Sequence, residues 1–152
     1  DFINPFLTAA IKVLKIQYFT EAKPQKPHSK QSSDKYHGDI SGVIGLLSDA
    51  FTGSVVISFP SKTFLQLMSR MLKTEFTVIN KIIEDGAGEL TNMIFGQAKT
   101  ALNEKGYGVK TALPSVVCGN DHHVELLSTG PRVAIPFNSD AGQFYIEICV
   151  TE

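Results

Sequence analysis

A carboxylate and a carboxamide stand close together on a helical segment in the middle of the chain. Residues 84–108 have helical periodicity, and Glu89 and Asn92 are three residues apart, which makes their side chains neighbours on one helix face. Asp85 lies one turn before Glu89 on that face, and Gly96 lies one turn beyond Asn92. We interpret this face as one that a partner approaches, with Glu89 and Asn92 offering a carboxylate and an amide.

Three glycines in the same segment need an explanation, because a glycine inside a helix costs roughly 1 kcal/mol relative to alanine. On an exposed helix face a glycine lets another surface come close to the backbone, which fits Gly96. The alternative is that the glycines seat the helix closely on a sheet and the polar side chains are merely solvated. Gly86 leans toward the apolar side and favours that alternative, whereas Gly88 is ambiguous.

The chain has 152 residues, of which 43% are hydrophobic, and its formal net charge is -1. The length and apolar content fit one domain, which we expect over residues 1–152. The small net charge does not favour nucleic acid or an anionic membrane as a partner. No apolar run in the sequence approaches the 18 or so residues of a membrane span, and we expect a cytoplasmic protein.

The hydrophobic pattern predicts a helix, a β-hairpin, two further helices and then several strands. Helices are expected over 4–14, 61–73 and 77–106, and residues 16–22 could end the first helix or form an edge strand. Residues 23–34 are expected to form a loop, and residues 39–49 and 53–59 a hairpin. Strand-like runs follow at 108–119, 123–130, 131–139 and 142–150. Because short turns join most strands, we expect an α+β domain in which long helices pack on a largely antiparallel sheet.

Other motifs that could carry chemistry are weak. His122 and His123 follow Asp121, but adjacent histidines in a strand point to opposite faces, so we expect no metal site. Ser54 and Ser61 lack the partners of a serine hydrolase. The glycines form neither a phosphate-binding loop nor a dinucleotide fingerprint.

The two cysteines, Cys118 and Cys149, form no paired motif. Both lie in apolar strand-like runs, and we expect buried free thiols in a reducing compartment.

Nearly the full length of the chain resembles the CheX-like chemotaxis phosphatases, which are relatives of CheC and FliY. Their motif is an Asp or Ser, three residues, Glu, two residues, Asn, and a Pro about twenty residues later. Here it reads Asp85, Glu89, Asn92 and Pro114, with one residue fewer than usual before the proline. The runs INPFLTAAIKVL, GVIGLLSDAFTGSVVISFP and IPFNSDAGQFYIEICV resemble other parts of the family. CheC-like proteins often carry two copies of the Glu-x-x-Asn motif and CheX-like proteins carry one. The single copy in this chain therefore resembles CheX.

The resemblance implies a CheX/CheC-like α+β fold and a homodimer joined through its sheets. It implies hydrolysis of the phospho-aspartate of a CheY-type response regulator, in chemotaxis or a related two-component circuit. The partner would supply Mg²⁺ and a conserved lysine. By this analogy Glu89 pairs with that lysine and Asn92 orients a water in line with the phosphorus. Asp85, Gly96 and Pro114 are supporting or docking positions.

Two further hypotheses use the same sequence differently. A non-enzymatic adaptor would hold a receiver domain or a flagellar component through the same face without accelerating loss of the phosphoryl group. A stand-alone small-molecule enzyme would need a pocket with converging titratable groups.

Overall fold

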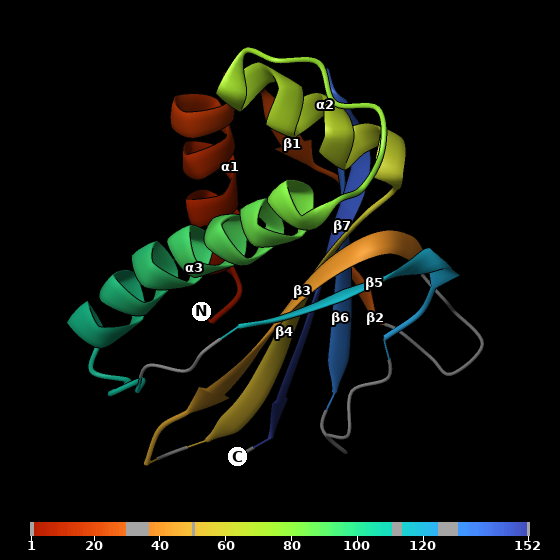
Figure 1. Cartoon of the computed structure of the whole chain (residues 1–152). Helices are drawn as coiled ribbons and strands as arrows, with labels where there is room; N and C mark the ends of the chain where they lie inside the picture. The colour runs from red at the N-terminus through yellow and green to blue at the C-terminus, as the bar shows by residue number, and fades with distance from the viewer. Residues whose placement is uncertain (1, 30–36, 50, 111–113, 125–130, 152) are drawn as a thin grey trace.

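The computed structural model describes residues 2–29, 37–49, 51–110, 114–124 and 131–151 (Figure 1). Within these ranges the chain forms three helices and seven strands. The helices are α1 (Asn4–Tyr18), α2 (Ser61–Leu72) and α3 (Lys81–Glu104), and the strands are β1 (Ala22–Pro24), β2 (His28–Ser29), β3 (Gly38–Leu47), β4 (Thr52–Phe59), β5 (Ser115–His122), β6 (Arg132–Ser139) and β7 (Gly142–Thr151).

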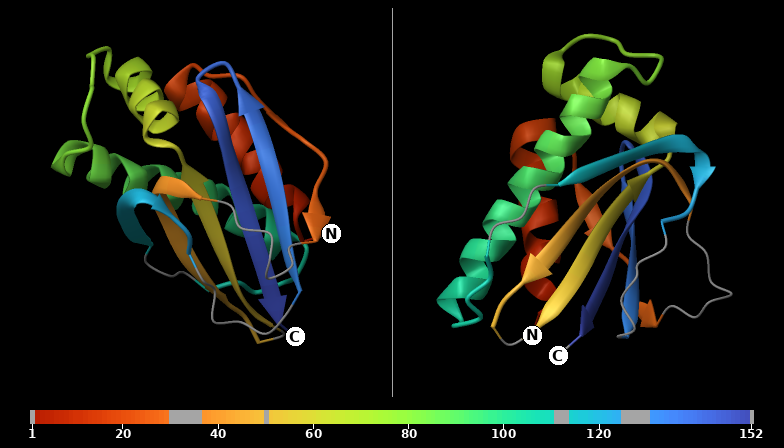
Figure 2. Two further views of the ribbon diagram at one scale, coloured as in Figure 1. Left: turned by 90° about the vertical axis from the view of Figure 1, so that its right-hand side faces the viewer. Right: turned by 60° about the horizontal axis from the view of Figure 1, so that its bottom comes forward.

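The strands form one antiparallel sheet in the order β1-β6-β7-β4-β3-β5, with β2 also paired to β6. The three helices gather on one face of this sheet, and α3 runs across it beside α1 (Figures 1 and 2). The expected α+β architecture with a largely antiparallel sheet is therefore confirmed.

The core lies between that sheet face and the helices. Successive strand residues point to opposite faces, so Val55, Ile57 and Phe59 of β4 face the helices while the residues between them face away. Leu90 and Ile94 of α3 are fully buried in the same core. None of the helices in the described ranges is long and apolar enough to cross a membrane.

The predicted hairpin over 39–49 and 53–59 is confirmed as β3 and β4. The ambiguous run 16–22 divides between the end of α1 at Tyr18 and the first residue of β1, Ala22.

The prediction of a loop over 23–34 is wrong in part, because β1 and β2 pair with β6 there. Pro24 is tolerated since β1 is an edge strand, where a missing N–H need not leave a ladder hydrogen bond unmade. Residues 30–36 lie outside the described ranges.

Two other strand predictions need correction. The strand expected over 108–119 begins only at Ser115, although Lys110 makes an isolated bridge to Leu47, and residues 111–113 are not described. In the run 123–130, His123 and Val124 are not in a strand, and 125–130 lie outside the described residues.

The thiol prediction holds for one cysteine and fails for the other. Cys149 is buried, whereas Cys118 is exposed. Cys118 belongs to β5, an edge strand paired only with β3, so less of it is covered than in a central strand.

Candidate functional site

Helix α3 carries the residues that the sequence singled out. It begins at Lys81 rather than at the predicted residue 77, because Asn80 is the N-cap and its side chain accepts a hydrogen bond from the Ile83 N–H at 3.1 Å. It ends at Glu104, close to the expected end. The helical period predicts an apolar stripe at Ile79, Ile83, Ala87, Leu90, Ile94, Ala98 and Ala101. Five of these residues are buried in α3, whereas Ala101 is only half-buried and Ile79 precedes the helix. The buried side also includes residues that the period did not single out. These buried residues are Ile83, Gly86, Ala87, Leu90, Thr91, Ile94, Phe95, Ala98 and Leu102.

The opposite side of α3 is a stripe of exposed residues, which we call the polar stripe: Asp85, Glu89, Asn92 and Gly96. Neither Glu89 nor Asn92 makes a hydrogen bond or ion pair with another residue in the described part of the chain. A carboxylate and an amide therefore face solvent one turn apart, with their hydrogen-bonding capacity available to a partner.

Asp85 differs from the other two polar residues because it has an ion-pair partner. Its Oδ1 lies 3.1 Å from Lys81 Nζ, four residues earlier on the helix surface. The carboxylate beside Lys81 raises the pKa of that ammonium. Since both groups are well exposed, the pair supports the first turn of α3 only modestly, and Asp85 is less available to a partner than Glu89.

The three glycines of α3 have three different surroundings. A Cβ at Gly86 would collide with the Met68 side chain of α2, so this glycine lets the two helices approach. A Cβ at Gly88 would meet Val116 of β5 at 3.6 Å, an ordinary contact. A Cβ at Gly96 would meet nothing within 4 Å. Packing within the described molecule thus explains Gly86 and does not explain Gly96.

Pro114 lies apart from α3 in the chain but beside it in the fold. It is half-buried and immediately precedes β5. Two residues later, Val116 is the residue that Gly88 of α3 approaches. The start of β5 therefore runs alongside the N-terminal half of α3.

No sequence pattern indicates the contact between β3 and α3 that helps to set the position of the polar stripe. A Cβ at Gly42 of β3 would overlap the Thr91 hydroxyl, so the glycine lets α3 lie directly on the strand. Thr91 donates its hydroxyl to the Ala87 carbonyl at 2.7 Å, which keeps that side chain against its own helix. Gly42 and Thr91 are far apart in sequence, so only the fold reveals that they meet.

Tyr18 is a second neighbour that sequence reasoning missed. Its side chain is fully buried at the end of α1, and its hydroxyl has no hydrogen-bond partner among the described residues. Burial, and secondarily the negative charge of Glu89, raises the pKa of this hydroxyl. The Tyr18 phenol therefore stays neutral at physiological pH. It lies close enough to Glu89 for the carboxylate charge to contribute to the raised pKa.

The histidine run does not assemble a metal site in the part of the chain that is described, where no group of three or more His, Cys, Asp or Glu side chains could hold an ion. His122 instead uses both ring nitrogens in the fold: Nε2 lies 2.7 Å from Ser41 Oγ, and Nδ1 lies 2.7 Å from the Gly119 carbonyl oxygen. Ser41 Oγ also lies 2.7 Å from Ser58 Oγ. Both serines are fully buried, which indicates a structural network rather than a nucleophile open to substrate.

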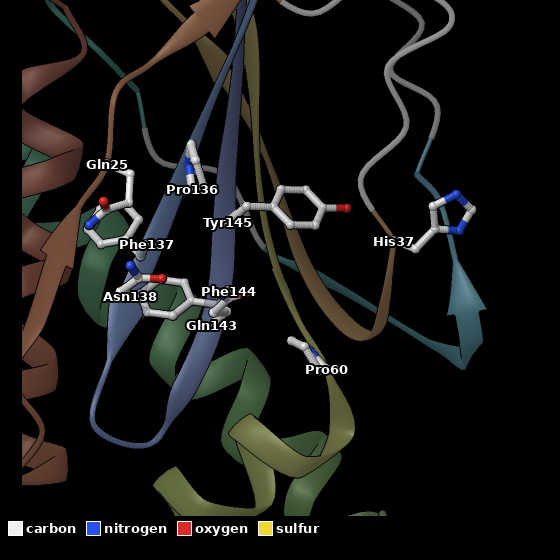
Figure 3. A pocket seen from close by; sticks show the side chains of 9 residues that line it. All are labelled: Gln25, His37, Pro60, Pro136, Phe137, Asn138, Gln143, Phe144 and Tyr145. Atoms are coloured by element: carbon white, nitrogen blue, oxygen red, sulfur yellow. The ribbon is translucent and has the colours of Figure 1, made fainter.

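A pocket of about 400 Å³ lies away from the polar stripe, on the β6–β7 part of the sheet (Figure 3). Among its lining residues the titratable groups are His37 and Tyr145, and burial raises the pKa of Tyr145 to about 12. Figure 3 shows amides and aromatic rings making up much of the rest of the wall. A phenol held neutral and one histidine are not a converging acid–base pair, so this pocket does not favour a small-molecule enzyme.

Comparison with known proteins gives a consistent result. The family model described as chemotaxis phosphatase CheX matches residues 40–138. The curated CheY-P phosphatase CheX of Thermotoga maritima is 26% identical over 137 residues, which cover 90% of this chain and 86% of that protein.

Two solved structures extend the comparison. The chemotaxis protein CheX from Vibrio vulnificus is 38% identical, with 99% of each chain covered and a TM-score of 0.94. The Borrelia burgdorferi structure of CheX in complex with CheY, BeF3 and Mg²⁺ is 24% identical, with 100% of this chain and 99% of that chain covered and a TM-score of 0.83, which shows a shared fold.

Proposed function

This chain belongs to the family of CheX chemotaxis phosphatases, and on that premise we propose that it hydrolyses the phospho-aspartate of a CheY-type response regulator through the polar stripe of α3. The observation that carries the assignment of the site is the pair Glu89 and Asn92, exposed one turn apart with no partner among the described residues. Such a pair is open to a macromolecular substrate rather than enclosed in a pocket.

Asn92 is the residue that we propose acts on the reacting atoms. Phosphoryl transfer requires mainly positioning and electrostatic stabilisation from a protein. A carboxamide can donate one hydrogen bond and accept another, so it can hold a water in line with the phosphorus while staying neutral. A carboxylate at the same position would repel the phosphoryl oxygens.

Glu89 is proposed to dock the receiver. Its carboxylate is exposed beside Asn92 and can pair with a lysine of the partner near the phosphorylated site. Such a pair adds register and specificity, because it becomes desolvated only when the two surfaces meet. Asp85 and Pro114 are proposed as supporting positions. Asp85 pairs with Lys81 at the start of α3. Pro114 immediately precedes β5, which runs alongside α3.

Mg²⁺ is proposed to come from the receiver. The polar stripe offers Asp85 and Glu89 as oxygen donors, but Asp85 is paired with Lys81, and no group of three ligating side chains was found among the described residues. Bound to the receiver, the ion would offset charge on the phosphoryl oxygens, while this chain positions the water and the docking carboxylate.

We further propose a cytoplasmic location, where response regulators act, a homodimer of this chain, and a single domain over residues 1–152. The buried apolar residues that line the helix side of the sheet form one main cluster drawn from helices and strands along most of the chain, which supports a single domain over residues 1–152.

The test is the decay of a phosphorylated CheY-type receiver in Mg²⁺, with the parent protein and with Asn92→Ala. We expect the parent to accelerate decay and Asn92→Ala to lose activity on the order of 100-fold or more, because the water is no longer oriented. Gln97→Ala is the matched control, since it removes an exposed amide from the same helix about 140° around from Asn92. Full activity of Asn92→Ala would refute the assignment of that residue.

Glu89→Ala separates docking from chemistry in the same assay. We expect KM to rise while kcat is largely retained, and the salt dependence of KM to weaken because one ion pair is lost. Binding of the receiver without any acceleration by the parent would instead identify an adaptor.

A further inference from the structure

An exposed apolar residue continues the polar stripe toward the start of α3. Ile82 lies three residues before Asp85 and seven before Glu89, so it falls on the same side of the helix. Its exposed fraction is 54%, and Val78, four residues earlier in the α2–α3 connection, is exposed at 64%. Neither is among the apolar residues that pack against the described core clusters. An isoleucine in this position contributes little to the fold.

The whole stripe has a regular spacing. Ile82, Asp85, Glu89, Asn92 and Gly96 follow one another at intervals of three, four, three and four residues. This is the spacing with which one face of a helix meets a facing surface. The left view of Figure 2 shows the first turn of α3 and the connection before it projecting at the side of the molecule away from β6 and β7.

We propose that Ile82, together with Val78 four residues before it, is an apolar anchor for the receiver and sets the affinity and selectivity of docking. This inference rests on the proposed function, and it adds a part of the interface that takes no part in the chemistry. The occupant would be an apolar patch of the receiver next to its phosphorylated site.

The chemistry of the stripe favours such an anchor. The ion pair expected at Glu89 adds specificity more than affinity, because the cost of desolvating both charges offsets much of their attraction. Interfaces commonly place an apolar contact at the centre and charged groups around it. Here the Lys81–Asp85 pair lies next to Ile82 and provides such a charged border.

A second copy of this chain is the competing occupant. A copy seated on Ile82 would also lie over Asp85, and then over Glu89 one turn further along, because all three share one face. It would thereby cover the residues that the receiver must reach. A receiver bound at Ile82 would instead have its phosphorylated site next to Glu89 and Asn92, so its binding is compatible with catalysis.

The experiment measures kcat and KM for the phosphorylated receiver with the parent, Ile82→Ala and Ile82→Asp. Alanine has a higher helix propensity than isoleucine, and an aspartate is favourable in the first turn of a helix, so both variants should fold. We expect Ile82→Ala to raise KM roughly five- to tenfold and Ile82→Asp to raise it further, with kcat unchanged. Val78→Ala should give a smaller rise.

Leu47→Ala is the matched control. Leu47 is about as exposed as Ile82, at 52%, but it is the last residue of β3 and does not belong to the polar stripe of α3. Binding is measured independently by calorimetry with a CheY-type receiver activated by beryllofluoride and Mg²⁺, in an Asn92→Ala background in which turnover does not interfere. The affinity should fall by the same factor as KM rises.

Each result has a distinct meaning. A parent that accelerates decay together with an Ile82→Asp variant of unchanged KM and affinity would overturn the anchor but leave the proposed function intact. A parent that accelerates decay of no receiver in a panel would overturn the proposed function and the anchor with it. Sedimentation showing that Ile82→Asp dissociates a dimer while KM stays constant would assign the surface to a second copy and refute the proposal.

Discussion

At the residue scale, the division of labour on α3 follows from what each side chain already contacts. Asp85 is occupied by Lys81, whereas Glu89 and Asn92 have no partner among the described residues. The charge of Glu89 also contributes to the raised pKa of the buried Tyr18 hydroxyl, a polar group that no motif indicates. The two carboxylates lie on adjacent turns of α3, but only Glu89 is free to pair with a partner protein.

Gly96 provides a test of why a glycine stands on this face. Because a Cβ there would meet nothing within 4 Å, we expect Gly96→Ala to raise the free energy of unfolding by about 1 kcal/mol. We also expect kcat/KM for the phosphorylated receiver to fall several-fold, since the added methyl group would hold the receiver away from the helix next to Asn92. Urea denaturation and receiver decay measure the two effects.

Gly88→Ala is the control for that pair of measurements. Its Cβ would make an ordinary contact with Val116, so it should stabilise α3 while leaving activity unchanged. If Gly96→Ala kept full activity, close approach of a partner would not be the reason for the glycine.

At the element scale, the close contact between β3 and α3 decides where the polar stripe lies. Gly42 allows Thr91 to rest against the strand, and Thr91 is in turn held by its hydrogen bond to the Ala87 carbonyl. Since Thr91 directly precedes Asn92, any displacement of α3 at this contact moves the amide as well.

We expect Gly42→Ala to destabilise the protein by about 1–3 kcal/mol, because the new methyl group would overlap the Thr91 side chain in a packed core. Activity should fall as well. The double variant Gly42→Ala with Thr91→Ala should recover part of the lost stability, because the overlapping hydroxyl is gone. Urea denaturation of the two single variants and the double variant measures the coupling, and strictly additive losses would contradict a direct contact.

At the scale of the whole molecule, Asp39 joins three elements. Its Oδ2 accepts a hydrogen bond from the Ser61 N–H at the start of α2 (2.6 Å), and its Oδ1 accepts one from the Asp121 N–H near the end of β5 (2.8 Å). The N-cap position of α2, Pro60, has no side-chain cap of its own, so Asp39 of β3 provides this cap from a distant part of the chain.

This arrangement predicts a pH-dependent stability. The two backbone N–H donors lower the pKa of Asp39 in the folded state. A lowered folded-state pKa stabilises the protein above the unfolded-state pKa, and that stabilisation is lost as the pH falls through the folded-state value. We therefore expect Asp39→Asn to be less stable than the parent at pH 7, with a difference that shrinks in the acid range. Urea denaturation from pH 7 to pH 3 tests this, and a difference independent of pH would contradict it.

The features that could be predicted from the sequence are those that depend on local periodicity. The apolar repeat of α3, its exposed polar residues and the β3–β4 hairpin follow from the 3.6-residue and two-residue periods of helices and strands, and the structure agrees with each of them. The motif Glu89-x-x-Asn92, together with the full-length resemblance, indicates the family from the sequence alone.

Features that depend on which distant residues meet could not be predicted and are seen only in the folded chain. The order of strands leaves β5 at an edge and Cys118 exposed, although its local sequence is apolar. Gly42 meets Thr91, Gly86 meets Met68, and Tyr18 comes under the influence of Glu89 because helices cross the sheet at particular points. The physical reason is that side-chain periodicity is a local property of the backbone, whereas these contacts depend on how elements far apart in the chain pack together.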